Sequence, residues 1–262
     1  MDRKTLLDRA ARDAEERVLL AHVLDRCEQC RARGIPTHTD FLSPAEQRAA
    51  QDLLNAAGVR EGYAFCGGCE RAERRMLCFL PEWQEQTDGA EHMAALRAAF
   101  REEDGLTHRD LLGSLMGLGI ARGKVGDIFV SGGSADLIVG NEIAPYLCEH
   151  WTGAGRTKLS VTEIPLAALS VPEQRVREIR DTVATLRLDA VTACGFSMSR
   201  AKASELIAAG RVQKNYRETT KGDAPVAEGD VISARGLGKF EVAEVGGKSR
   251  KGRTAILLRR YL

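Results

Sequence analysis

The chain has 262 residues and a mass of 28.5 kDa, and 44% of its residues are hydrophobic and 29% charged. This composition excludes a disordered chain, and the length allows two or three small domains. No apolar run approaches the roughly 18 residues that cross a bilayer, and the charged start lacks the apolar core of a signal peptide. We therefore expect a cytoplasmic protein that does not insert into membranes. Seven cysteines, an odd number, favour free thiols over a disulfide framework.

The net charge of +1 is divided unevenly along the chain. Residues 180–262 hold 16 Lys and Arg against nine Asp and Glu, a net +7, whereas residues 1–179 hold 22 against 28, a net −6. The charges in the C-terminal part alternate with apolar residues, which is typical of a folded module rather than a low-complexity tail. This asymmetry indicates a basic folded module, which either binds a polyanion or presents a solvated basic face with no partner.

Residues 1–82 predict a small helical α/β domain. Apolar residues within 6–24 recur at spacings of three and four, which predicts one amphipathic helix or a broken pair of helices. Ser43 is placed to cap a further helix, because proline and then glutamate follow at the first and third helical positions. Two short strands, 63–66 and 76–80, complete the domain.

Residues 90–166 predict the β-α-β-β-α-β order of a ferredoxin-like domain. The expected elements are a strand at 93–100, a helix opened by Thr107, hairpin strands at 127–131 and 135–139, a helix from Asn141 to Trp151 and a strand at 159–164. Because many functions share this fold, it does not by itself indicate an activity. Residues 171–187 then predict a charged helical connector.

Residues 186–262 predict a helix pair followed by a small sheet. The first helix begins at Leu188, and Ser199 caps the second, whose first turn carries Arg200 and Lys202. Cations there oppose the helix dipole by roughly 0.3–1 kcal/mol, whereas a phosphate would be favoured by the dipole, the free amides and both side chains. The expected strands centre on Val212, Val231, Phe240 and Ile256.

The residues of this C-terminal part closely resemble an RNA-binding domain that is named after a small-subunit ribosomal protein. The segments that carry this likeness are 186–189, 195–203, 206–212 and 228–233. The same helix pair occurs in pseudouridine synthases and in bacterial tyrosyl-tRNA synthetases. The resemblance implies a ribosomal-protein-S4-like RNA-binding domain over residues 186–262.

Further segments, 39–44, 67–68, 72–74, 106–113, 117–120 and 126–128, resemble the YlmH family of bacterial RNA-binding proteins. The family implies an α+β protein with an N-terminal α/β domain (1–82), a ferredoxin-like RNA-binding domain (90–166) and the S4-like domain (186–262). It also implies a non-enzymatic role in ribosome-associated quality control of stalled nascent chains. The expected partner is rRNA of the large ribosomal subunit, with peptidyl-tRNA present, and we expect a monomer without a cofactor.

Ten residues are the expected RNA contacts of the basic module. Arg187, Arg200, Lys202, Arg211 and Lys214 are predicted to contact phosphates, and Asn215 and Tyr216 to contact bases or sugars. The set is completed by Ser199 at the helix cap and by Lys239 and Lys251 on the hairpins. The alternative function is an RNA-modifying enzyme, similar to a pseudouridine synthase, that the basic module targets to RNA.

Two other motifs have competing interpretations. The pairs Cys27-x-x-Cys30 and Cys66-x-x-Cys69 could form a zinc site, but about 35 residues separate them and the first pair lies in a predicted helix, so unligated thiols are favoured and no metal site is assigned. His108-Arg109-Asp110 lacks the other motifs of a kinase, which favours helix capping by Asp110 and leaves a ribosome contact by His108 and Arg109 open.

Overall fold

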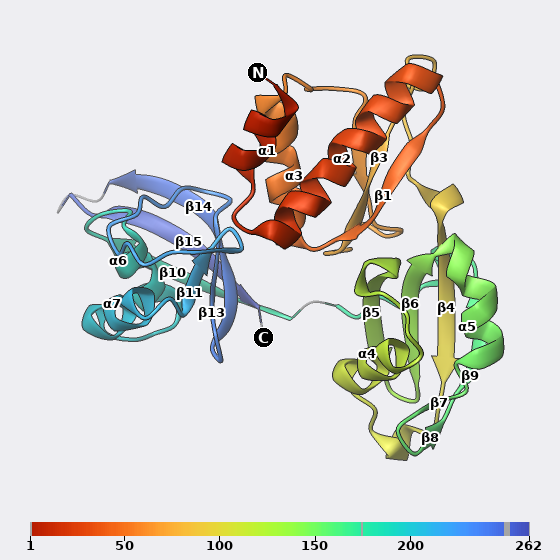
Figure 1. The fold of residues 1–262 in the computed structure, drawn as a ribbon. Coiled ribbons are helices and arrows are strands. Elements are labelled where there is room, and N and C mark those ends of the chain that lie inside the picture. Colours follow the sequence, from red (N-terminus) through yellow and green to blue (C-terminus); the bar gives the residue numbers. More distant parts are fainter. Residues whose placement is uncertain (1, 174, 249–251, 262) are drawn as a thin grey trace. The chain divides into compact units, whose positions relative to one another are not determined.

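The computed structural model describes residues 2–173, 175–248 and 252–261 (Figure 1). It divides into two compact units, Met1–Pro172 and Glu173–Leu262. The described residues form seven α-helices and four sheets, so the mixed α and β class predicted from the sequence is confirmed. Within these described ranges, no helix combines the length and the apolar character that a membrane crossing requires.

The first sheet of the N-terminal unit has three strands in the order β1-β3-β2. Its elements are α1 (Arg3–Ala10), α2 (Ala14–Arg33), β1 (Thr37–Leu42), α3 (Pro44–Ala56), β2 (Tyr63–Cys66) and β3 (Arg75–Phe79). The first helical stretch is therefore a broken pair, because the Asp13 side chain accepts a hydrogen bond from the Glu16 amide and begins α2. The predicted capping box between Ser43 and Glu46 is present at the start of α3.

The second sheet of this unit has the order β5-β6-β4-β9. The chain around this sheet forms η1 (Ala90–His92), β4 (Met93–Ala99), η2 (Glu102–Asp104), α4 (His108–Gly117), η3 (Arg122–Lys124), β5 (Val125–Ser131), β6 (Ser134–Gly140), η4 (Asn141–Ile143), α5 (Ala144–His150), β9 (Ser160–Ile164) and η5 (Leu166–Ala168). Between α5 and β9, the strands β7 (Gly153–Ala154) and β8 (Thr157–Lys158) pair with each other in a separate two-stranded sheet. Strand β6 lies between β4 and β5, so each β-α-β connection spans an intervening strand.

The predicted cap at Asn141 is wrong. Asn141 lies in the 3₁₀ turn η4, and its side-chain amide donates to the Glu91 carbonyl at 3.2 Å. No side chain caps α5, which has proline in its first turn instead. Proline fits that position because its missing N–H is one that a helix start leaves unpaired anyway.

Opposite faces of the strands serve different cores in the N-terminal unit. On β3, Leu77 and Phe79 pack with the helices, whereas Met76 and Cys78 face away from them. On β6, Leu137 and Val139 pack against α4 and α5, whereas Ile138 faces away. The faces without helices meet in a shared cluster of Phe41, Cys66, Met76, Cys78, Met93 and Ile138. The two sheets therefore belong to one compact unit.

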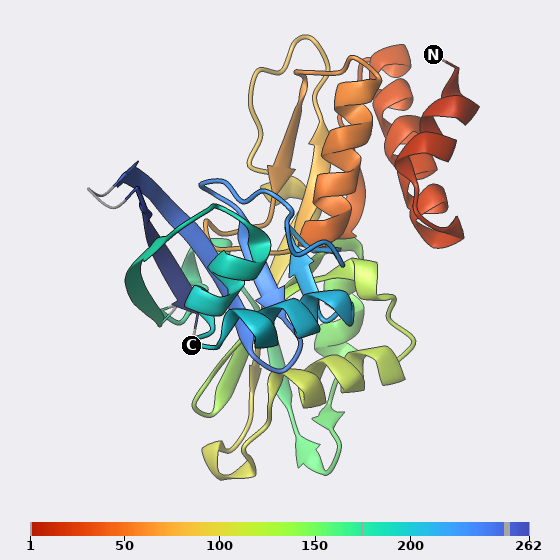
Figure 2. The same cartoon turned by 90° about the vertical axis from the view of Figure 1, so that its left-hand side faces the viewer.

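The C-terminal unit is one six-stranded sheet, in the order β10-β15-β14-β13-β11-β12, with two helices on one face (Figure 2). Its elements are β10 (Val176–Val183), α6 (Leu188–Gly195), α7 (Arg200–Ala208), β11 (Val212–Lys214), β12 (Arg217–Glu218), β13 (Val231–Ala234), β14 (Gly238–Lys248) and β15 (Thr254–Tyr261). Gly195 permits the close packing, since a Cβ there would lie 2.3 Å from the Phe240 ring.

The helical connector predicted for residues 171–187 is wrong. Val176–Val183 form β10, which pairs antiparallel with β15 from Val176↔Tyr261 to Val183↔Thr254. Ile179 and Val183 turn toward the core, while the charged residues stay exposed at the sheet edge. Charged residues at spacings of three and four are typical of an exposed helix face, which explains the prediction. The segment is instead rich in β-branched residues that fit a pleated surface, namely Val176, Ile179, Thr182 and Val183.

Candidate nucleic-acid interface

A buried carboxylate organises two of the predicted cations at the start of α6. The side chain of Asp189 is only 7% exposed, and Arg187 Nη2 and Arg200 Nη2 each donate to its Oδ2 at 3.0 Å. The two arginines remain 42% and 54% exposed. Because both guanidiniums share one anchor, α6 and the start of α7 present two adjacent positive groups in a fixed arrangement.

The start of α7 has the geometry that the sequence predicts. Ser199 is the N-cap, and its Oγ accepts a hydrogen bond from the Lys202 amide at 3.2 Å. The Lys202 ammonium lies 3.1 Å from Glu205 on the helix surface, where both side chains are exposed. An exposed pair of this kind contributes little to stability, so Lys202 can exchange Glu205 for a phosphate at small cost. Arg211, at the exposed end of the helix pair, makes one long contact of 3.5 Å with the Arg235 carbonyl.

Lys214 and Asn215 are used inside the protein. Lys214 Nζ donates to the Pro225 carbonyl at 2.6 Å and lies 2.9 Å from Asp230 Oδ2. The Asn215 side chain donates to Asp230 Oδ1 at 2.6 Å and accepts from the Val231 amide at 2.8 Å. Both side chains hold the β11–β12 turn against β13, so their geometry favours a structural role over direct contact with RNA.

The turn between β11 and β12 holds Tyr216 in a strained conformation. Asn215 and Tyr216 have φ angles of 50° and 62°, and Lys214 pairs with Arg217, which defines a two-residue hairpin loop with both central residues left-handed. Asn tolerates this region, but an aromatic residue there costs on the order of 1–2 kcal/mol. Strain at an aromatic residue beside the basic surface favours a functional role for Tyr216.

Replacement of Tyr216 by glycine is expected to stabilise the protein by about 1 kcal/mol, because glycine adopts the left-handed region without strain. The same change is expected to weaken RNA binding about tenfold, since loss of one base–aromatic stack costs about 1–3 kcal/mol. Thermal melting and RNA titration of the same variant measure both effects. A variant that melts earlier and binds RNA unchanged would show that Tyr216 has only a structural role.

The remaining two predicted contacts are Lys239 and Lys251. Lys239, on β14, lies over the ring of Tyr261 with its ammonium 5.2 Å from the ring centroid. Lys251 lies outside the described residues. The structure therefore brings together Arg187, Ser199, Arg200 and Lys202, with Arg211 at the end of the same helix pair.

Sequence reasoning missed two carboxylates: Asp189, which anchors Arg187 and Arg200, and Asp230, which holds the β11–β12 turn. Burial acts to raise the pKa of Asp189, but hydrogen bonds from Arg187 and Arg200 outweigh it and hold that pKa below the usual 3.8. The pKa of Asp230 is also lowered, because hydrogen bonds from Ala227, Lys214 and Asn215 outweigh its burial. Both residues lie in segments that carry the family resemblance. An acidic residue within those segments of a basic module was the sequence signal that could have identified them.

The two CxxC pairs occupy different cores. Cys27 and Cys30 are buried on α2 in the cluster beneath the N-terminal helices, whereas Cys66 and Cys69 belong to the cluster between the two sheets. In the part of the chain that the structure describes, no group of three or more His, Cys, Asp and Glu residues could hold a metal ion. The pairs therefore do not form one four-cysteine site.

The purified protein is expected to contain far less than one zinc ion per chain, since a structural zinc site needs four converging ligands. Elemental analysis of the protein checks this directly. One zinc per chain that disappears in Cys66→Ser would contradict the prediction and assign a metal site to the second pair.

Comparisons with known proteins agree with the resemblance seen in the sequence. A family model described as "Putative RNA-binding domain in YlmH" matches residues 101–168. The chain is 35% identical over 223 residues to the ribosome-associated protein quality control protein P2 of Bacillus subtilis (strain 168). This match covers 85% of this chain and 86% of that protein. The solved structure of the cell division protein ylmH from Streptococcus pneumoniae matches with a TM-score of 0.50 and 19% identity, over 62% of this chain and 98% of that one, which shows a shared fold. On the extent and identity of the match to the B. subtilis protein, the chain belongs to the YlmH family.

Proposed function

We propose that this protein binds rRNA of the large ribosomal subunit, without catalysing a reaction, in quality control of stalled nascent chains. The observation that carries the proposal is the pair of arginines held on buried Asp189 beside the capped start of α7. Guanidinium groups fixed in this way suit RNA phosphates, because little side-chain freedom is lost on binding. The name of the B. subtilis relative and the description of the matched family model support the same role.

The finer parts of the proposal follow from the arrangement of each unit. The order β5-β6-β4-β9 supports a ferredoxin-like domain within residues 90–166, and α6, α7 and the following strands support an S4-like domain within 186–262. We further propose a cytoplasmic monomer that needs no cofactor and acts on subunits that carry peptidyl-tRNA. A protein that acts on ribosomes is expected in the cytoplasm.

A second basic surface lies within the matched region 101–168. A cavity of about 520 Å³ between α4 and the β7–β8 hairpin is lined by Arg109 and Arg156, together with Gly113 and Gly155. Neither arginine side chain makes an ion pair or hydrogen bond with another described residue. This surface supports RNA contact by the middle domain and by Arg109 in particular, whereas Asp110 bonds to Thr107 in the predicted capping box.

Binding to large ribosomal subunits is expected to fall steeply with salt. If about five cations each neutralise a phosphate, the log–log slope of affinity against salt concentration is roughly −3 to −5. Co-sedimentation of the full chain with purified large subunits, over a series of salt concentrations, measures this slope. Affinity that does not change between low and physiological ionic strength would contradict the proposed phosphate contacts.

A further inference from the structure

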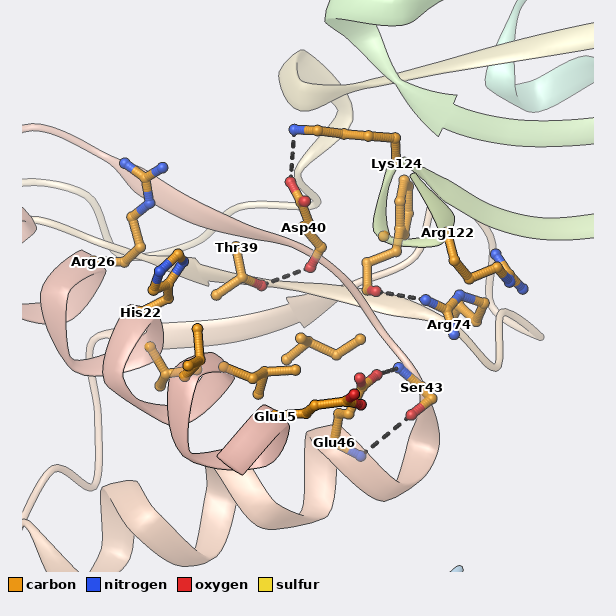
Figure 3. A pocket seen from close by; sticks show the side chains of 16 residues that line it. Glu15, His22, Arg26, Thr39, Asp40, Ser43, Glu46, Arg74, Arg122 and Lys124 are labelled. Carbon is orange, nitrogen blue, oxygen red and sulfur yellow. Dashed lines mark hydrogen bonds and ion pairs between the residues drawn. The ribbon is translucent and has the colours of Figure 1, made fainter. Parts of the chain in front are cut away.

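The N-terminal unit contains a cavity that the proposed RNA interface does not use. Its volume is about 560 Å³, and its walls come from α2, β1, the start of α3 and the turn η3 (Figure 3). Val18, Leu19 and Phe41 supply apolar wall, and His22 and Arg26 lie on the α2 side. Cavities of roughly 300–1,000 Å³ with an apolar wall and a few polar groups are typical of small-molecule sites.

Two guanidinium groups lie side by side at one end of this cavity. Arg74 donates to the Phe41 carbonyl at 2.7 Å and to the Val125 carbonyl at 3.1 Å. Arg122 donates to the same Val125 carbonyl and, at 3.3 Å, to that of Gly126. Because one carbonyl oxygen accepts from both, the two positive groups are adjacent, as Figure 3 shows. Each keeps N–H groups that these backbone contacts do not use.

Neither guanidinium has a carboxylate at ion-pair distance among the described residues. Of the nearby acids, Glu46 accepts from the Ser43 amide at 2.5 Å and Asp127 accepts from the amides of Glu73 and Arg74. The charges of Glu46 and Asp127 still act to raise the pKa of both guanidiniums, and Glu15 also lines the cavity. Burial lowers the pKa of Arg122 to about 10, with the positive charge of Arg74 as a further cause. Two half-buried cations that share one carbonyl acceptor repel each other, so an anion between them would lower the energy of both.

Close approach of the two sheets creates this end of the cavity. A Cβ on Gly123 would lie 3.1 Å from Asp40, and one on Gly126 would lie 3.0 Å from the Phe41 ring, so glycine at both positions lets η3 and β5 approach β1. Lys124 then bridges Asp40 and Glu142 at 2.7 Å each. Residues 39–43 and Arg74, from segments that carry the family resemblance, line this cavity, and Gly126 of segment 126–128 accepts a hydrogen bond from Arg122. None of these segments belongs to the C-terminal unit.

We propose that this cavity binds a phosphate-bearing ligand of nucleotide size, with Arg74 and Arg122 donating hydrogen bonds to its phosphoryl oxygens. Paired guanidiniums match the geometry of phosphate, because each can donate two parallel N–H bonds. The apolar wall formed by Val18, Leu19 and Phe41 suits the flat body of a base. The phosphate can come from a free nucleotide or from the end of an RNA strand, and the proposal does not rest on ribosome binding.

Calorimetric titration of the full chain with inorganic phosphate and with AMP tests the site. We expect saturable binding of AMP, tighter than that of phosphate, and a loss of at least about tenfold in Arg122→Gln. Arg177→Gln serves as the matched control, because it removes the same charge from the exposed strand β10, which belongs to neither proposed site, and should bind AMP as the wild type does. Absence of saturable AMP binding by the wild-type chain up to about 10 mM, or unchanged binding by Arg122→Gln, would overturn the proposal.

Two further measurements complete the test. In ribosome co-sedimentation, Arg122→Gln is expected to bind normally and Arg200→Gln weakly, so failure of one proposal can be separated from failure of the other. The second measurement asks whether an oligoribonucleotide displaces AMP from the cavity. Displacement by the form with a 5′-phosphate, but not by the 5′-hydroxyl form, assigns the phosphate to an RNA end. No displacement by either form assigns it to a free nucleotide. If Arg122→Gln does not fold, the wild-type titration and Arg122→Lys, expected to retain partial affinity, decide the matter.

Discussion

Replacing Arg200 and Lys202 together by alanine is expected to weaken binding to large ribosomal subunits about a hundredfold or more. Each lost charge-assisted bond to a phosphate costs about 1.5–3 kcal/mol, and about 1.4 kcal/mol corresponds to a factor of ten in affinity. Both side chains are more than half exposed at the capped start of α7, so they can reach a partner without rearrangement of the helix. Co-sedimentation at one fixed salt concentration measures the loss.

The stability of this double variant is expected to fall by no more than about 1 kcal/mol. Removal of both cations relieves repulsion at the helix N-terminus, but loss of Arg200 also removes one of the two partners of Asp189. Arg187 still pairs with the carboxylate, so no unpaired buried charge is left. The control is Arg177→Ala with Arg180→Ala, which removes the same charge from the exposed strand β10 and should bind normally. A double variant that melts early yet co-sediments would show that Arg200 and Lys202 are structural.

Asp189→Ala is expected to destabilise the C-terminal unit by about 2–3 kcal/mol. The substitution removes the anchor of both Arg187 and Arg200 and leaves a poorly filled space beside them. Hydrogen exchange of the α6 and α7 amides measures the loss, and the amides of the N-terminal unit provide an internal control. Unchanged protection of α6 and α7 would contradict the anchoring role of Asp189.

The same carboxylates predict how the C-terminal unit responds to acid. Asp189 and Asp230 have pKa values below 3.8 in the folded protein, so the unfolded chain takes up their protons first as the pH falls. Their stabilisation is therefore complete above about pH 5 and is lost progressively as the pH drops through the folded values. In Asp189→Asn, part of this acid-dependent loss of stability should be absent. Melting temperatures of the wild type and the variant, measured from pH 7 down to about pH 3, test this.

The elements that the sequence predicts well are those with a local physical cause. Capping boxes at Ser43 and Thr107 begin α3 and α4 as predicted, because a side chain bonded to its own helix needs nothing from the rest of the fold. Strands β1 and β10 were missed because tertiary pairing decides them. Thr37–Leu42 and Val176–Val183 are extended through partners β3 and β15, which lie far along the chain.

The candidate site shows the same division between local and distant causes. Charge asymmetry and helix spacing located Arg200 and Lys202 at a helix start, where the structure places them. The internal partners of Lys214 and Asn215 could not be predicted, because Asp230 becomes adjacent to them only when β13 pairs with β11. The cavity beside Arg74 and Arg122 was not predicted either, since its walls come from segments spread over residues 15–124 of the chain.

The edges of the six-stranded sheet affect how the protein behaves at high concentration. A sheet edge with free backbone N–H and C=O groups can accept a strand from another chain and begin aggregation. Here one edge strand, β12, has only two residues, and the other, β10, carries alternating charges such as Arg177, Glu178 and Arg180 in exposed positions. Addition of a strand at either edge would offer few hydrogen bonds or would bury charge. Strand β10, which the sequence pattern predicts as a helix, therefore helps to protect the monomer that we propose from edge-to-edge association.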